Sequence, residues 1–346
     1  MSVFISGANG YIAKHIIGDL LDQNYKVIGT VRSQTKLENL EKQFDNNPNL
    51  TLEIVEDICK PVAFDNAIKK HCEDIKYVLH NASPFFFDTT DYVTDLLNPA
   101  LYGTRGILES IKKYGSTTVE RVVITSSFAT VFDYVKKDDD TCKINEESWN
   151  PDTWESCQTD NAPRAYCGSK KFAEQAAWEF LKANKDNVKF KLSTVNPDNV
   201  FGPQKFDADV SPKLNTSCEL INQVIHTPAD AQFDPTSGYG GFVDVRDVAK
   251  AHLLAFQNEN TINQRLIMHN GKFCSQDIAD VLNEDFSCLK GKIPVGKPHT
   301  GALYNSPRGV VVDNSKTKQI LGFKFIDLTK SIYDTAAQIL KTEGRL

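Results

Sequence analysis

Tyr166 and Lys170, four residues apart, are the side chains whose types and spacing point most directly to chemistry in this chain. The apolar residues between positions 172 and 181 recur at helical spacing, so the pair is expected on one face of a helix. A free phenol has a pKa of about 10 and holds its proton tightly near neutrality. A neighbouring ammonium favours the phenolate and lowers this pKa, so the pair predicts a tyrosine that acts as a general acid or base.

A glycine-containing turn near the N-terminus is the second signal. A short apolar strand at 3–6 precedes the turn, and a helical run through Leu21 follows it. The spacing is Gly-x-x-Gly-x-x-Ala, which lets the backbone approach a pyrophosphate at the start of the helix. An ordinary strand–helix connection is the alternative, but the position directly after a strand favours dinucleotide binding. The residues expected to bind the cofactor here are Gly7, Ala8, Asn9, Gly10, Tyr11 and Ile12.

Ser127 is the third signal. It follows an apolar strand at 121–125, and ligands of a doubly wound sheet bind at the carboxyl ends of its strands. A serine after a strand is by itself most often a turn residue or a helix cap. The order of glycine turn, strand-end serine and Tyr-x-x-x-Lys is much more specific than any of the three alone. It predicts Ser127, Tyr166 and Lys170 as the catalytic residues.

Strand and helix patterns alternate through the first 200 residues, which predicts an α/β protein with a Rossmann-type, doubly wound parallel sheet. The expected strands are 3–6, 26–31, 50–55, 76–80, 121–125 and 189–195. After Pro197, turn-rich stretches alternate with helical runs near 213–226, 245–257, 275–285 and 328–341. We therefore expect a cofactor-binding domain at 1–197 and a smaller, mainly substrate-binding lobe at 198–346, with some segments returning to the main domain.

With these motifs in this order, the chain resembles the extended short-chain dehydrogenase/reductase superfamily, and within it the dihydroflavonol-reductase-like carbonyl reductases of yeasts. The resemblance runs nearly end to end, and the stretches that carry it are 145–151, 200–204 and 243–250. It implies NADPH-dependent reduction of aldehydes and ketones to alcohols by hydride transfer. By this resemblance Tyr166 would donate the proton, Ser127 would hydrogen-bond the carbonyl oxygen, and Lys170 would bond the nicotinamide ribose.

The end of the second expected strand bears on the choice of cofactor. NAD-selective folds place a carboxylate there for the ribose 2′-hydroxyl, whereas an arginine accommodates a 2′-phosphate. This chain has Arg32 and, one turn later, Lys36, with no acid at this edge, which favours NADPH. The alternative is that both cations are solvated surface residues. The resemblance adds further cofactor contacts besides the tyrosine and the lysine, at Asp57, Ile58, Ala82, Pro197, Val200 and Ser217.

Aromatic residues follow the fourth and fifth expected strands, at the ligand-binding edge. Phenylalanines are usually buried, so plain core packing is the alternative to a substrate contact. The resemblance places Phe85 and Phe132 against the substrate, and Phe128 lies in the same stretch. Asp198 and Asn199 follow the sixth expected strand, where the family usually carries small, apolar or aromatic residues. One side of the substrate pocket is therefore expected to be polar.

The composition bounds the class of protein. The 346 residues carry a formal net charge of −6, which leaves no basic excess for a nucleic-acid partner. No long apolar segment predicts a membrane span, and the first expected strand starts too early for a signal peptide. Eight scattered cysteines without a CxxC pattern predict reduced thiols, and no metal-ligand cluster stands out. We expect a cytoplasmic monomer or homodimer that acts on small carbonyl compounds.

Two other classes of function share parts of this pattern. A non-catalytic NADP-binding sensor of the same fold would typically have lost the tyrosine or the lysine, and both are present. A nucleotide-sugar epimerase or dehydratase also has a glycine turn and Tyr-x-x-x-Lys, but it holds NAD through an acidic end of the second strand, which Arg32 argues against. An epimerase would copurify with bound nicotinamide, whereas a reductase would exchange NADPH freely.

Overall fold

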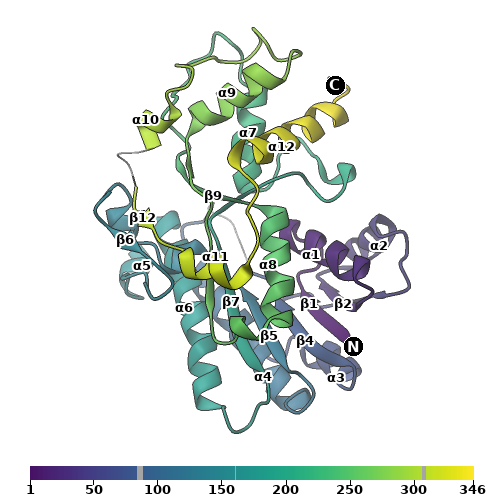
Figure 1. Ribbon diagram of the computed structural model, residues 1–346. Coiled ribbons are helices and arrows are strands. Elements are labelled where there is room, and N and C mark those ends of the chain that lie inside the picture. The colour runs from purple at the N-terminus through teal and green to yellow at the C-terminus, as the bar shows by residue number, and fades with distance from the viewer. Residues whose placement is uncertain (84–88, 160, 306–308) are drawn as a thin grey trace.

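A parallel sheet runs through the larger part of the protein (Figure 1). The computed structural model describes residues 1–83, 89–159, 161–305 and 309–346, and among these seven strands form the sheet, in the order β10-β7-β5-β4-β1-β2-β3. Every neighbouring pair in it is parallel. The strands are β1 (Ser2–Ser6), β2 (Lys26–Val31), β3 (Leu50–Ile54), β4 (Ile75–His80), β5 (Arg121–Thr125), β7 (Lys191–Pro197) and β10 (Arg265–Met268). The predicted Rossmann-type, doubly wound α/β fold is confirmed.

The six strands expected from the sequence all belong to this sheet, and their bounds differ from the expected ones by at most two residues. β10 (Arg265–Met268) was not among the expected strands. It becomes a strand because it pairs with β7, with Arg265 opposite Thr194 and Met268 opposite Pro197. The chain therefore returns to the main sheet after it has left β7.

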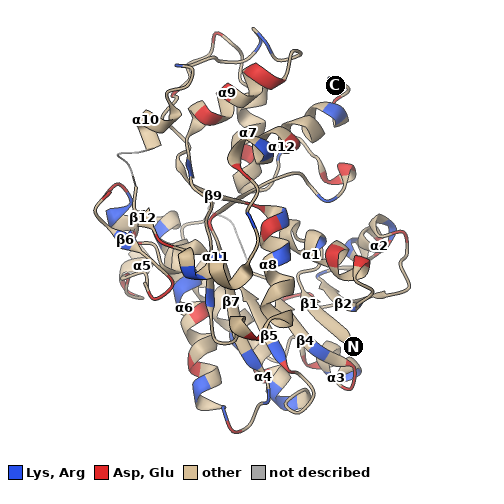
Figure 2. Cartoon of the chain, in the orientation of Figure 1, with Lys and Arg blue, Asp and Glu red and all other residues tan. Residues whose placement is uncertain are grey.

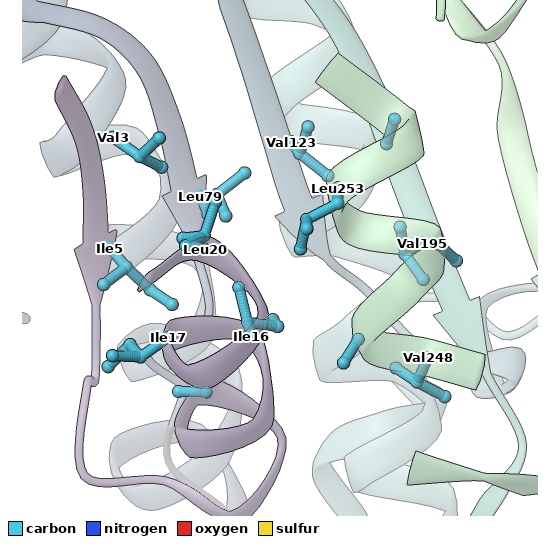
Figure 3. Packing of buried hydrophobic residues seen from close by; sticks show 14 of the residues in the cluster. Val3, Ile5, Ile16, Ile17, Leu20, Leu79, Val123, Val195, Val248 and Leu253 are labelled. Carbon is cyan, nitrogen blue, oxygen red and sulfur yellow. The ribbon is translucent and has the colours of Figure 1, made fainter. Parts of the chain in front are cut away.

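Helices cover both faces of the sheet. α1, α2 and α8 pack on one face, and α3, α4 and α6 pack on the other. Figure 3 shows the first face, where Ile16 and Leu20 of α1 and Leu253 of α8 pack with strand residues such as Ile5 and Val195. Because both faces are covered, a central strand such as β1 is buried along its whole length, whereas the edge strand β3 alternates between buried and more exposed residues. The bounds are α1 (Tyr11–Asp22), α2 (Gln34–Gln43), α3 (Asp65–His71), α4 (Asn98–Tyr114), α6 (Ala162–Ala183) and α8 (Val245–Gln257).

A smaller group of elements follows β7 and packs around a core of its own, which includes Phe201, Phe273, Ile278 and Ile332. This group contains a second sheet, with its strands in the order β11-β9-β8, and helices α7, α9 and α12 pack beside it. In Figure 2, acidic and basic residues are interspersed along the helices of both groups. The elements of the smaller group are β8 (Asn199–Phe201), α7 (Thr216–His226), β9 (Gly240–Asp244), β11 (Lys272–Phe273), α9 (Ser275–Asp285), α10 (Gly301–Asn305) and α12 (Leu328–Thr342).

The remaining helices and strands are short. A π-helical turn, η1 (Val93–Leu97), leads into α4, and the strand pair β6 (Lys143–Ile144) and β12 (Val311–Val312) joins a loop after β5 to the C-terminal part. Helix α11 (Ser315–Leu321) lies against β10, where Thr317 Oγ1 accepts a hydrogen bond from the N–H of Ile267 at 3.0 Å. The remaining short pieces are η2 (Phe128–Thr130), η3 (Tyr134–Lys136), α5 (Ser156–Thr159), η4 (Asp207–Asp209) and η5 (Glu259–Thr261).

Candidate active site

The turn between β1 and α1 has a shape that fits a dinucleotide. Gly7 has φ of 68°, and a Cβ on it would stand 3.0 Å from Cα of Ala82, so a side chain would be strained as well as crowded. Backbone hydrogen bonds from Ala8 to Thr30 (2.8 Å) and from Gly10 to Gly7 (2.9 Å) fix the turn. No side-chain cap occupies the start of α1. The first N–H groups of this helix are thus left for an anionic group.

Ser6 ties the end of β1 to the end of β4. Its Oγ accepts hydrogen bonds from the N–H groups of Asn81 (3.1 Å) and Ala82 (3.0 Å), and it lies 2.8 Å from Nδ1 of His80. Burial, together with the charge of Lys170, lowers the pKa of His80 to about 3. The side-chain amide of Asn81 has no hydrogen-bond partner among the described residues although both of its polar atoms are buried. Such an amide costs free energy until a bound polar group satisfies it, which fits a cofactor at this edge.

The predicted contacts to the adenosine half of a cofactor lie at the ends of β2 and β3. Arg32 follows β2 directly, Lys36 stands in the first turn of α2, and both side chains are exposed. No acid lies between them in the sequence. Asp57 is also exposed and accepts a hydrogen bond from the N–H of Cys59 at 2.9 Å, while Ile58 is half-buried. The cationic end of β2 suits a phosphate better than a ribose hydroxyl.

Helix α6 positions the tyrosine and the lysine. Asn161 caps its first turn by accepting a hydrogen bond from the N–H of Arg164 at 2.9 Å. Nζ of Lys170 lies 5.7 Å from the centre of the Tyr166 ring, so the two side chains share one face of the helix as expected. The same Nζ donates a hydrogen bond to Oγ of Ser83 at 2.8 Å. The lysine therefore reaches the chain that leaves β4, where a cofactor ribose is expected.

The expected lowering of the Tyr166 pKa is not found in this structure, where the pKa is raised. Burial is the largest influence on Tyr166 and raises its pKa well above the usual value, against a smaller lowering by a hydrogen bond with Ser127. Burial also lowers the pKa of Lys170 to about 8. The reason is that desolvation disfavours the charged form of both groups, phenolate and ammonium alike. Near neutrality Tyr166 thus carries the proton that a general acid needs.

Ser127 lies beside Tyr166, at the end of β5. It caps the 3₁₀ turn η2, because its Oγ accepts a hydrogen bond from the N–H of Ala129 at 3.1 Å. Its carbonyl oxygen accepts hydrogen bonds from Oγ1 of Thr130 (2.9 Å) and Nδ2 of Asn196 (3.3 Å). The structure thus brings together all three predicted catalytic residues, which come from two different elements.

A cavity of about 430 Å³ opens at Ser127 and Tyr166, and Lys170 is not among the residues that line it. The predicted site residues that line it are Ser127, Phe128, Phe132, Tyr166, Pro197, Asp198, Asn199 and Ser217. Val200 is buried behind the cavity, and its N–H donates to Oγ of Ser217 at 3.2 Å. The hydroxyl of Tyr11 points to the smaller group of elements, where it donates to the carbonyl of Gly202 at 2.7 Å. Phe85 lies outside the described residues.

Asp198 and Asn199 form one wall of the cavity together with a histidine that the sequence did not reveal. His269 Nδ1 lies 3.0 Å from Oδ2 of Asp198, and the imidazole stacks on Phe128 with the ring centres 5.9 Å apart. Asn199 Nδ2 donates to the carbonyl of Gly241 at 2.9 Å. A Cβ on Gly241 would collide with the Asp198–His269 pair. The polar side of the cavity is therefore a connected, close-packed group rather than two separate side chains.

Several residues that line the cavity were not predicted, because the strand or loop that positions them was not recognised in the sequence. His269 follows β10 directly, so its place at the carboxyl edge would have been foreseen had β10 been recognised. Tyr239, Lys137 and Lys272 come from loops and a two-residue strand and carry no local signal. The other lining residues not foreseen are Ala129, Cys167, Thr216, Gly240, Gly241, Asn305, Gly309, Val310 and Val312.

Within 1–83, 89–159, 161–305 and 309–346, no three His, Cys, Asp or Glu side chains are grouped as a metal ion would require. No helix in the same ranges is long and apolar enough to span a membrane.

Comparison with known proteins shows which family the chain belongs to. The chain is 59% identical over 346 residues to an NADPH-dependent methylglyoxal reductase of Saccharomyces cerevisiae, with complete coverage of both. It is 36% identical to a ketoreductase of Aspergillus niger, covering 98% of this chain and 97% of that protein.

Solved structures give the same result. The structure of the yeast methylglyoxal/isovaleraldehyde reductase with NADPH matches with a TM-score of 0.96 and covers both chains completely. That of a Candida albicans relative with NADPH matches with a TM-score of 0.94 at 45% identity, covering 99% of each chain. Residues 3–268 match the family described as NAD dependent epimerase/dehydratase, which is the extended short-chain dehydrogenase/reductase group. The chain belongs to this family.

Proposed function

We propose that this protein reduces aldehydes and ketones to alcohols with NADPH. The observation that carries the proposal is that Ser127 and Tyr166 line one cavity, while Lys170 lies near the Tyr166 ring and bonds to Ser83, next to the Ala82 that packs on Gly7. The relatives named above as NADPH-dependent reductases support the same reaction. A sensor without catalysis is disfavoured because the proton donor and its lysine are both in place.

The residues present fit NADPH. The turn at Gly7 and the start of α1 would receive the pyrophosphate, and Arg32 with Lys36 would receive the 2′-phosphate. Asp57 and Ile58 would flank the adenine, Ala82 would lie where the chain passes the cofactor ribose, and the remaining predicted contacts are Pro197, Val200 and Ser217. When bound, NADPH supplies the hydride for the carbonyl carbon. An epimerase-like use of tightly held NAD is disfavoured by the cationic end of β2.

Proton delivery falls to the protein. Tyr166 is protonated near neutrality because burial raises its pKa, and it would give its proton to the oxygen of the reduced carbonyl. Ser127 would donate a hydrogen bond to the same oxygen as negative charge develops there. Lys170, when protonated, would stabilise the phenolate that is left behind and would bind the ribose near Ser83.

The cavity walls suggest the class of substrate. Phe128 and Phe132, with ring centres 5.8 Å apart, provide an apolar side, and Asp198 with Asn199 provide a polar one. Such a cavity would orient a carbonyl compound that has one apolar and one polar substituent. We propose that residues 1–197, with α8 and β10 added, hold the cofactor, and that the rest of 198–346 mainly shapes this cavity.

We further propose a cytoplasmic monomer or homodimer. All eight cysteines lie in the described part of the chain and none forms a disulfide, which suits a reducing compartment.

The direct experiment is to follow NADPH absorbance with a panel of aldehydes, α-dicarbonyls, ketoesters and aryl ketones. We expect NADPH oxidation that depends on the carbonyl compound, with a protein that is purified free of bound nicotinamide. A folded protein that oxidises no NADPH with any member of the panel would defeat the proposal.

Replacing Tyr166 with phenylalanine removes the transferable proton and little else. We expect kcat to fall by about 10²- to 10⁴-fold, the range of general acid catalysis, while NADPH affinity stays nearly unchanged. Steady-state kinetics together with fluorescence titration of NADPH separates the two effects. If Tyr166→Phe keeps most of its kcat, the proton comes from another group.

The pKa of Lys170 predicts a pH dependence. Because its ammonium is the form that serves the reaction, activity should be present below a pH of about 8 and decline as the pH rises through that value. The quantity to measure is kcat/KM for NADPH between about pH 6.5 and 10, since it reports the free enzyme. Lys170→Ala should be less active and lack this decline. A wild-type profile that is flat over the range contradicts the role given to the ammonium.

Replacing Arg32 with glutamate should weaken NADPH binding at least about tenfold, because a charge-assisted hydrogen bond is lost and a repulsion is gained. NADH should be affected much less. Lys42→Glu makes the same charge change in the last turn of α2 and serves as the control, with little expected effect on either cofactor. Equal losses for NADPH and NADH in Arg32→Glu would show that Arg32 does not contact the 2′-phosphate.

A further inference from the structure

Helix α6 carries a third side chain in register with the tyrosine and the lysine. Glu174 stands one turn beyond Lys170 and is 1% exposed. Its carboxylate accepts hydrogen bonds from Nε of Arg265 at 2.5 Å and from Nε1 of Trp178 at 3.1 Å. It also accepts from Oγ of Ser126 at 2.5 Å and from Nδ2 of Asn196 at 2.7 Å. Two of these partners, Ser126 and Asn196, stand at the carboxyl ends of β5 and β7.

Each nitrogen of the Arg265 guanidinium in this cluster donates a hydrogen bond. Arg265 comes from β10, and its Nη1 donates to the carbonyls of Glu146 (3.0 Å) and Ser148 (2.5 Å). Its Nη2 donates to Oγ1 of Thr130 at 2.9 Å. The guanidinium also lies 3.8 Å from the centre of the Trp149 ring. The segment at 145–151, which stood out in the sequence without a role, therefore closes the cluster from outside.

The cluster converges on the backbone of Ser127. Asn196 Nδ2, besides bonding to Glu174, donates to Oγ1 of Thr130 at 2.9 Å and to the carbonyl of Ser127 at 3.3 Å. Thr130 Oγ1 in turn donates to the same carbonyl at 2.9 Å. The N–H of Asn150, in the segment at 145–151, donates a hydrogen bond to the carbonyl of Thr130 at 2.7 Å. Two side chains linked to Glu174 and Arg265 thus fix the peptide that carries the Ser127 hydroxyl.

We propose that Glu174 is a positioning residue for the reduction: through Asn196 and Thr130 it holds Ser127 in register with Tyr166 and Lys170 of the same helix. The proposal rests on the proposed function, because it assigns Ser127 a part in that reaction. The geometry suits a carboxylate, since each of the named partners donates a hydrogen bond to it. An amide in its place would have to turn its NH₂ towards a donor. A buried charge on Arg265 would also lose its counter-charge.

A double-mutant cycle with Ser127 tests the proposal. Glu174→Gln in the wild-type background should lower kcat by about 30-fold, with NADPH affinity unchanged within about threefold. In the Ser127→Ala background the same substitution should lower kcat by less than about threefold, because the group it positions is already gone. Equal losses in the two backgrounds, or full kcat in folded Glu174→Gln, would overturn the proposal.

A matched control separates positioning from loss of stability. Asp65 is also a buried carboxylate, at the start of α3, and it accepts hydrogen bonds from Ser110 (2.6 Å) and Lys113 (2.7 Å) of α4. Asp65→Asn should lower the melting temperature as Glu174→Gln does, yet keep kcat within about twofold. If Asp65→Asn loses kcat as severely as Glu174→Gln, the effect is one of general stability and the proposal fails.

A readout without turnover distinguishes this proposal from the proposed function. Amide hydrogen exchange of a peptide spanning 126–131 should be faster in Glu174→Gln and unchanged in Asp65→Asn. Unchanged exchange in both variants contradicts the positioning role, whether or not the protein reduces carbonyl compounds. If Glu174→Gln does not fold, Thr130→Val removes the link between Arg265 and Ser127 with little change in volume. The cycle and the exchange experiment with Thr130→Val should then give the same pattern, and their failure to do so overturns the proposal.

Discussion

Parallel strand pairing determines where chemistry takes place in this protein. Since neighbouring strands run the same way, the residues that follow them meet at one edge of the sheet. The turn after β1, Asn81 after β4, Ser127 after β5 and His269 after β10 are far apart in the sequence and close to this edge in space. Helix α6 then needs to present only Tyr166 and Lys170 to complete the site.

Burial shifts the pKa values of Tyr166 and Lys170, at this edge of the sheet, in opposite directions. It keeps the proton on the phenol of Tyr166 and makes the ammonium of Lys170 easier to discharge. The pKa of Lys170 thus moves towards neutrality and that of Tyr166 away from it, so the phenol is protonated and available as a donor but is a weaker acid than a free phenol. The neighbouring Glu174 and Arg265 are buried as well, but they remain paired and hydrogen-bonded, which is the condition for a charge inside a protein. Burial in the fold therefore affects the pKa values of Tyr166 and Lys170 and also the environment of the Glu174–Arg265 pair.

The sequence was sufficient for six of the seven strands of the sheet and for the site residues that come from local motifs. The turn at Gly7, the Tyr166–Lys170 pair and Ser127 each have a spacing that is tied to a strand or helix, and the structure brings them together. His269 and Arg265 were not foreseen because both belong to the short strand β10, whose existence depends on pairing with β7. The direction of the tyrosine pKa was also missed, because burial is a property of the whole fold and not of a four-residue spacing.

The most direct measurement of the central claim follows the hydrogen itself. NADPH that carries deuterium at both C4 positions of the nicotinamide is mixed with the enzyme and a carbonyl compound in ordinary water, and the alcohol is analysed by mass spectrometry. Hydride transfer predicts one deuterium per product molecule, on the carbinol carbon, with the proton on oxygen drawn from Tyr166 and exchangeable with water. An alcohol without deuterium, formed while NADPH is consumed, would contradict the account.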